Sequence, residues 1–248
     1  LIQQFAGSEE FVGLYIPLPD VAEDAPAAPA SITPHFTNDA LQGTVNMRLP
    51  TKTYAGETIT DATLGYRVYI DGELAAEGEG EPGTIVRPEV TVAESKTYRF
   101  EACAVNGAGE GQRIHIDKFV GKDQPVAPKN VRLQKTDDEG GVKLTWAAPT
   151  TGVHDGYVTP ADLNYTVVRM PDSVAVATHT TERTLTETLP TEQMVNYYYR
   201  VTPFNGDIEG QTAESNRLTL GYIVEVPWQE DFEDLSVVPN MLTFIDAN

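Results

Sequence analysis

The sequence predicts an all-β protein made of two consecutive antiparallel β-sandwiches, with extra strands at both ends. Three observations favour this fold class. The chain repeats itself at an offset of 99 residues. Apolar residues alternate over short runs bounded by turn-forming residues, and no stretch carries the apolar stripe of a helix. With 248 residues the chain is long enough for two domains, each with its own core.

The repeat extends through most of the chain and involves residue types that set structure. The offset pairs Ala28 with Ala127, Pro29 with Pro128, Pro50 with Pro149, Tyr66 with Tyr165, Tyr98 with Tyr197, Asn106 with Asn205, and Gly111 with Gly210. Internal repeats at one fixed offset indicate duplicated structural units. We therefore predict one module at residues 26–124 and a second at residues 125–221.

Within each module the periodicity is that of strands. Val142, Leu144 and Trp146 alternate with polar residues, and the same holds from Tyr98 to Ala104. Side chains of a strand point alternately to its two faces, so this pattern indicates strands with one buried face. Several such strands in about 100 residues, without helices between them, are typical of an antiparallel sandwich.

At these residues the chain resembles the fibronectin type III family, whose domains are immunoglobulin-like sandwiches. The second copy carries the residues of the resemblance, which are Pro128, Val142, Leu144, Trp146, Pro149, Tyr165, Val167, Leu189, Pro190, Tyr197, Tyr199, Val201, Asn205 and Gly206. The resemblance implies that Trp146 is the core indole of the second strand. It also implies that Tyr197 is the corner tyrosine, with its hydroxyl bonded to nearby backbone. The first copy departs from the pattern at Met47, and we expect this methionine to fill the core instead.

The two ends are expected to belong to other domains. Residues 1–25 contain a predicted hairpin, with strands at 1–5 and 11–16, from an upstream domain or an appendage. Residues 222–248 contain the run Pro-Trp-Gln-Glu-Asp-Phe-Glu, which starts at Pro227. This run resembles the first strand of the cleaved-adhesin or choice-of-anchor jelly rolls of Bacteroidetes surface proteins. We therefore expect a third domain that starts here. The proline-containing segment 122–128 is expected to be a semi-rigid linker.

Composition argues against several classes of partner. Lys and Arg number 17 against 37 Asp and Glu, which gives a net charge of −20. Such a surface repels nucleic acid and anionic membranes. The single cysteine, Cys103, excludes an intrachain disulfide, and no apolar run is long enough to span a bilayer.

The sequence offers little for catalysis, metals or cofactors. The histidines are His35, His115, His154 and His179, and no two have metal-ligand spacing. Strand alternation predicts that Cys103 is an inert thiol on the outer face. The glycines of residues 106–111 indicate a loop between antiparallel strands. The acidic run 137–139 is expected to be a solvated turn, and the run 230–234 is a calcium-ligand candidate only in a complete domain. We therefore expect no catalytic residue, no bound metal and no cofactor.

The remaining candidates for binding are loops. Residues 51–62 with 106–111, and residues 150–161 with 205–210, are expected to lie at one end of each sandwich. Tyr54, Tyr157 and Ile208 would be the apolar residues of a recognition patch there. Asn205-Gly206-Asp207 is not an Arg-Gly-Asp motif.

The leading functional hypothesis is a non-catalytic spacer or adhesion module, extracellular or on the cell surface, whose partner is an unknown protein or glycan. Two alternatives stay open. The chain could be an accessory region of a surface peptidase or glycosidase, in which case neighbouring sequence would encode the catalytic domain. It could also be a carbohydrate-binding module.

Overall fold

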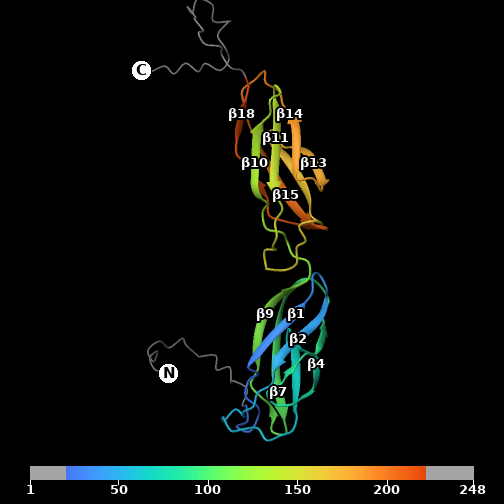
Figure 1. Cartoon of the computed structure of the whole chain (residues 1–248), viewed down its shortest axis with the longest axis vertical. Helices are drawn as coiled ribbons and strands as arrows, with labels where there is room; N and C mark the ends of the chain where they lie inside the picture. The colour runs from blue at the N-terminus through green and yellow to red at the C-terminus, as the bar shows by residue number, and fades with distance from the viewer. Residues whose placement is uncertain (1–20, 222–248) are drawn as a thin grey trace, which may run out of the picture. The chain divides into compact units, whose positions relative to one another are not determined.

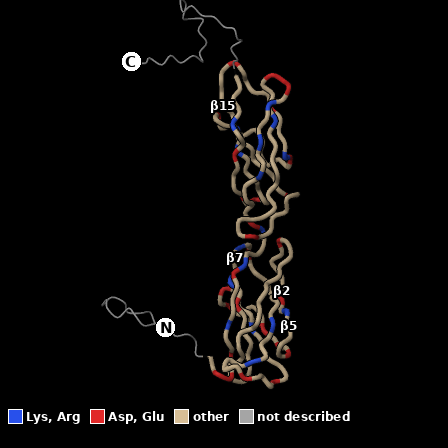
Figure 2. The backbone as a smooth tube through the Cα atoms, turned by 60° about the vertical axis from the view of Figure 1, so that its left-hand side comes forward, with Lys and Arg blue, Asp and Glu red and all other residues tan. Residues whose placement is uncertain are grey.

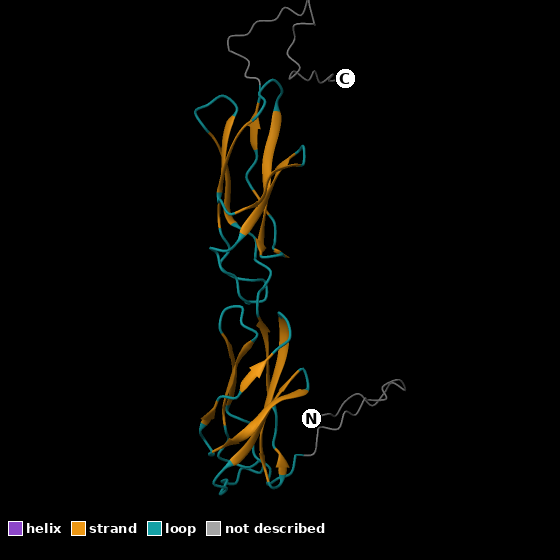
Figure 3. Cartoon of the chain, turned by 90° about the vertical axis from the view of Figure 1, so that its right-hand side faces the viewer, coloured by secondary structure: helices purple, strands orange, loops and turns teal. Residues whose placement is uncertain are grey.

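The structure, a computed structural model, describes residues 21–221 as strands joined by loops and turns, with no helix in that range (Figure 3). No helix that could cross a membrane occurs in this part of the chain. The predicted hairpin at residues 1–16 and the predicted jelly-roll start at residues 222–248 lie outside the described residues. The described residues divide into two units, unit 1 (21–37, 41–93 and 98–118) and unit 2 (38–40, 94–97 and 119–221).

Unit 1 is a sandwich of two antiparallel sheets (Figure 1). One sheet contains β1 (Ser31–Phe36), β2 (Gln42–Arg48), β5 (Ile85–Val86) and β6 (Glu89–Thr91). The other contains β3 (Leu64–Ile70), β4 (Glu73–Gly80), β7 (Lys96–Asn106), β8 (Gly109–Glu110) and β9 (Ile114–Val120). In the second sheet the strand order begins β4-β3-β7, so strands adjacent in space are not always consecutive in sequence.

Unit 2 repeats this arrangement. Its smaller sheet has the order β10-β11-β14, formed by β10 (Lys129–Lys135), β11 (Gly141–Ala147) and β14 (Thr184–Thr188). Its larger sheet contains β12 (Asn164–Met170), β13 (Val174–Thr180), β15 (Val195–Asn205), β16 (Ile208–Glu209), β17 (Ala213–Glu214) and β18 (Leu218–Leu220). The fold class is therefore all-β, with two tandem immunoglobulin-like sandwiches.

The strands of the two units correspond to one another at the same offset of 99 residues as the sequence repeat. Adding 99 to the bounds of β2, β7 and β8 gives the bounds of β11, β15 and β16. Val68 pairs with Ala102 in unit 1, and Val167 pairs with Val201 in unit 2. Corresponding residues thus occupy corresponding places in the two sheets, which explains why many structure-setting residues match at this offset.

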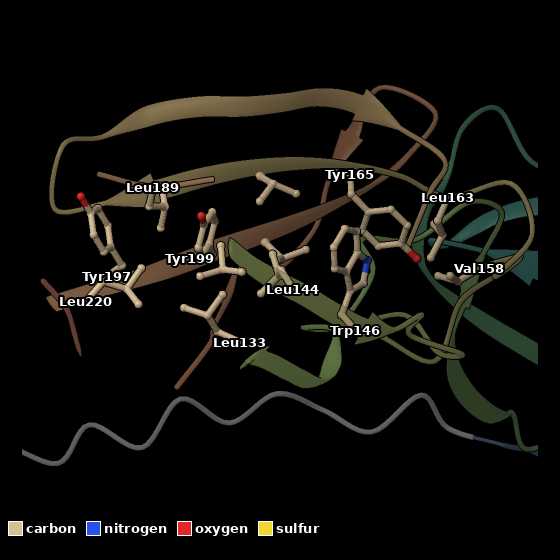
Figure 4. Close-up of a cluster of buried hydrophobic side chains, with 13 residues drawn as sticks. Leu133, Leu144, Trp146, Val158, Leu163, Tyr165, Leu189, Tyr197, Tyr199 and Leu220 are labelled. Atoms are coloured by element: carbon tan, nitrogen blue, oxygen red, sulfur yellow. The ribbon is translucent and has the colours of Figure 1, made fainter. Parts of the chain in front are cut away.

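The alternating apolar residues form the core of each unit, as predicted. In unit 2 the Trp146 side chain packs edge-on against Tyr165, with ring centroids 5.4 Å apart, and Tyr197 and Tyr199 lie in the same cluster (Figure 4). In unit 1, Met47 is fully buried at the position equivalent to Trp146. The ring of Tyr197 is buried as expected, but within residues 21–221 its hydroxyl makes no backbone hydrogen bond of the predicted kind.

The prediction that Cys103 is an outward-facing thiol is wrong. Cys103 lies opposite Arg67 in the β3–β7 pair, on the face away from the core as strand alternation requires. It is nevertheless completely buried, because this part of the outer face is occupied by Tyr69, with the Arg113 guanidinium 3.8 Å above the Tyr69 ring. Alternation predicted the face correctly, but it contains no information about which long side chains lie over that face.

Candidate functional site

The two predicted loops of unit 1 meet at one end of the sandwich, where both bond to the segment that enters it. The amide of Tyr54 donates a 2.7 Å hydrogen bond to the carbonyl of Ala25. The Asn106 side chain donates a 2.9 Å bond to the carbonyl of Asp24. A Cβ at Gly111 would lie 2.0 Å from the Pro26 carbonyl oxygen, so only glycine permits this close approach. The loops are therefore fixed by the entering segment.

The loops of unit 2 are fixed in the same way. The Asn205 side-chain amide donates 3.0 Å hydrogen bonds to the carbonyls of Asp123 and Tyr157. The amide of Val153 donates to the Gln124 carbonyl at 2.9 Å. Asp123 stands 99 residues after Asp24, as Asn205 does after Asn106, so both copies use the same anchor.

Unit 2 adds a carboxylate contact to this anchor. Asp123 is 1% exposed. Its Oδ2 accepts hydrogen bonds from the amides of His154 (2.7 Å) and Gly156 (3.0 Å), and its Oδ1 accepts one from the amide of Gln124 (2.7 Å). The Nδ1 atom of His154 lies 2.9 Å from Oδ1. Burial acts to raise the pKa of Asp123, but these hydrogen bonds outweigh burial, and the pKa is lowered.

The expected recognition patch is only partly exposed at these loops. Tyr54 is 52% exposed, whereas Tyr157 and Ile208 are half-buried. Tyr157 also belongs to the anchor through its backbone, because its carbonyl accepts from both Asn205 and the amide of Asp123. The patch stays a prediction, with Tyr54 as its most accessible aromatic residue.

A compact polar cluster lies on the outer face of the large sheet of unit 1. Glu110 accepts hydrogen bonds from the Tyr69 hydroxyl (2.5 Å), from Arg67 Nη1 (2.7 Å) and from Arg113 Nη2 (2.9 Å). Burial opposes ionisation of Glu110, but the three donors outweigh it and lower its pKa to about 2. Burial raises the pKa of the neighbouring Cys103 thiol to about 11. The thiol is therefore protonated at neutral pH, which agrees with an unreactive cysteine.

The Glu110 cluster gives unit 1 a stability that depends on pH. Because the pKa of Glu110 is lower in the folded than in the unfolded state, ionised Glu110 stabilises unit 1 above pH about 4.5. This contribution is lost as the pH falls toward about 2. Thermal unfolding of Glu110→Gln between pH 6 and pH 2.5 should show a smaller loss of Tm than the wild-type chain. Equal loss in both proteins would contradict the role given to Glu110.

The other sequence candidates lie apart from one another. All four histidines are exposed, and no group of three His, Cys, Asp or Glu side chains with metal-binding geometry occurs within residues 21–221. The acidic residues 137–139 form an exposed turn between β10 and β11, as predicted. Residues 107–108 form the turn between β7 and β8, as predicted for the glycine-rich loop. The acidic run 230–234 lies outside the described residues.

The sequence analysis missed the Asp123 anchor and the Glu110 cluster. Asp24 and Asp123 share the offset of the repeat, and extending the comparison to them would have indicated a structural role. Glu110 also matches Glu209 at this offset, but the match does not reveal its three donors, which come from β3 and from the segment after β8. That arrangement depends on strand pairing that the sequence does not display.

These observations define the class of protein, which is a tandem β-sandwich protein whose loops are anchored by the segment that enters each sandwich. No family model matches the chain. Its fold is similar to several solved structures with fibronectin type III domains. The FN1–FN3 domains of chicken CNTN1 share 15% identity with the chain, cover 81% of it and 69% of their own length, and give a TM-score of 0.37. Two fibronectin type III domains of chicken tenascin share 14% identity, cover 77% of the chain and 98% of their own length, and give a TM-score of 0.32.

A third solved structure is the d3–d4 part of the extracellular region of rat CD45. It shares 10% identity and gives a TM-score of 0.32. The match covers 43% of this chain and 55% of the CD45 chain, so only about half of that structure is matched. At these identities the three likenesses concern the fold alone.

Proposed function

We propose that the chain is a non-catalytic spacer and adhesion segment of a bacterial protein that is secreted or held at the cell surface. An extracellular location is supported by two resemblances in the sequence. The two modules resemble fibronectin type III domains, and the segment that starts at Pro227 resembles the first strand of adhesin jelly rolls. The repeated residues support a structural role, because Asn106, Asn205 and Gly111 hold the entering segments in place instead of presenting reactive groups.

The observation that carries the proposal is a clamp between the first and last strands of unit 2. The side-chain amide of Asn216, between β17 and β18, pairs with the backbone of Leu133 in β10. Its Oδ1 accepts from the Leu133 amide at 2.8 Å, and its Nδ2 donates to the Leu133 carbonyl at 3.0 Å. The clamp thus reproduces the two hydrogen bonds of a strand pair. Tension between the ends of a spacer would load these two strands first.

Single-molecule extension of the full chain tests this proposal. We expect two separate unfolding events, each releasing roughly 300 Å of chain, since each unit contains roughly 100 residues. Asn216→Ala should lower the unfolding force of one event and leave the other unchanged. Asn196→Ala, a change at an exposed position of β15, is the matched control and should alter neither. A single event for both units, or no effect of Asn216→Ala, would contradict the spacer role.

A further inference from the structure

The outer face of the small sheet of unit 2 carries three cations that we call the cationic face, Lys129, Arg132 and Lys143. Arg132 lies opposite Thr145, and Gln134 lies opposite Lys143. Lys129 lies opposite Ala147, and a register shift between Lys129 and Arg132 keeps both on the same face. The inward-facing neighbours Leu133, Leu144 and Trp146 belong to the core, so the three cations point away from it.

These cations have no anionic partner in the described part of the chain. All three are exposed, and within residues 21–221 the ion pairs of the structure involve other residues. Glu187 is the one carboxylate of β10, β11 and β14. It bonds instead to Arg169 and to the Tyr199 hydroxyl. Figure 2 marks lysines and arginines along the strands of this unit.

The first copy lacks the cationic face. At the offset of 99, the positions of Lys129, Arg132 and Lys143 are occupied by Ala30, Thr33 and Thr44. In unit 1, Thr44 lies opposite Glu89, so the corresponding face carries a carboxylate. The fold therefore does not require cations at these positions. Their presence in one copy of a chain with a net charge of −20 indicates a use other than stability.

The shape of the face limits what can bind. Three neighbouring strands present a strip about 10 Å wide, and charge acts over only about 8 Å at physiological salt. A bilayer or a nucleic-acid duplex extends beyond this strip and would meet the acidic remainder of the surface. A single linear polyanion is narrow enough to stay within the strip and would not meet the acidic surface around it. The large exposed apolar residues of unit 2, Val153, Val174 and Met194, all lie outside β10, β11 and β14, so an acidic peptide would find no apolar anchor there.

The polar neighbours of the cations favour a sugar. Gln134, Thr184 and Thr186 are exposed on the same face, since Thr184 pairs with Thr145 and Thr186 with Lys143. Hydroxyl and amide groups both donate and accept, which suits the hydroxyl groups of a glycan. We propose that the cationic face binds a linear polysaccharide that carries carboxylate or sulfate groups. This inference names the ligand class for the adhesion role proposed above, and rests on it.

Binding of the full chain to three polymers of matched length tests the inference. The probes are dextran sulfate and polygalacturonate as anionic polysaccharides, and neutral dextran. We expect both anionic polymers to bind and neutral dextran to show no binding. Affinity should fall roughly twentyfold to fortyfold between 50 and 200 mM salt, as for release of counterions from three contacts. The variant Lys129→Ala, Arg132→Thr, Lys143→Thr, which installs the residues of the first copy, should lose at least about tenfold in affinity at low salt.

The matched control removes three exposed cations from unit 1 by Arg87→Thr, Arg99→Thr and Lys118→Thr. It changes the net charge equally and should retain most of the affinity. Equal loss in both variants would overturn the inference, because it would assign binding to net charge. A fourth polymer of matched length, poly-glutamate, tests the part played by the sugar. Equal affinity for poly-glutamate and for the two anionic polysaccharides would also overturn the inference, since the sugar would then contribute nothing. Either failure leaves the two unfolding events of the spacer test unaffected, so the two proposals can fail separately.

Discussion

Replacing Trp146 by alanine is expected to lower the free energy of unfolding of unit 2 by about 3–5 kcal/mol. The indole is 6% exposed and lies in one cluster with Tyr165, Tyr199 and Leu144, so its removal leaves a cavity that neighbouring strands cannot close. Urea unfolding followed by circular dichroism should show one of two transitions moved to lower urea. The transition of unit 1 should be unchanged.

The first copy provides the matched control for this change. Met47 fills the equivalent position in unit 1 and is fully buried. Trp146→Met should therefore cost less than Trp146→Ala, because the flexible thioether fills part of the space. If both variants lost the same stability, or if both transitions moved, Trp146 would not be the centre of a core confined to unit 2.

Asp123→Ala should destabilise unit 2 by about 2–4 kcal/mol, because several backbone donors would lose their acceptor together. The amides of His154, Gly156 and Gln124 all donate to this buried carboxylate. The pKa of Asp123 is lowered in the folded state, so the carboxylate stabilises unit 2 above its unfolded pKa of about 3.9, and this contribution disappears as the pH falls below that value. The difference between wild type and variant should accordingly shrink in urea unfolding below pH about 4.

Asp24→Ala is the control for this prediction. Asp24 is the counterpart of Asp123 in unit 1, but its side chain is exposed, and its part in the anchor is its backbone carbonyl, which alanine retains. We expect a change within about 0.5 kcal/mol. A loss as large as that of Asp123→Ala would show that the buried carboxylate is not what distinguishes unit 2.

Sequence periodicity was sufficient to predict the two sandwiches, because both the repeat and the apolar alternation arise from strand pairing. Val142, Leu144 and Trp146 are buried as their spacing predicts, and Met47 replaces the missing tryptophan in the first core. The offset even gives the bounds of β11 and β15 from those of β2 and β7. Backbone register was predictable here because each strand has one apolar face that can only be buried one way.

Side-chain contacts on the outer faces were not predictable in this way. Cys103 follows the alternation, yet Tyr69 and Arg113 lie over it, and nothing local to Cys103 indicates this. The cationic face was missed because Lys129, Arg132 and Lys143 are spread over two strands and become neighbours only through the β10–β11 register. The Asp123 anchor was missed because the residue stands in a proline-containing stretch that reads as a linker.

The anchoring of each entering segment has a consequence for how such a module can be copied. In unit 2 the Pro125 carbonyl accepts from the Gln211 amide at 2.9 Å, and the Asp123 carbonyl accepts from Asn205. The peptide that leads into the sandwich is thus part of its hydrogen-bonding inventory. A gene duplication that copied only the strands would produce a module whose loops lack hydrogen-bond partners for their backbone and side-chain amides. A duplication that included the entering segment would produce a module that supplies these partners itself.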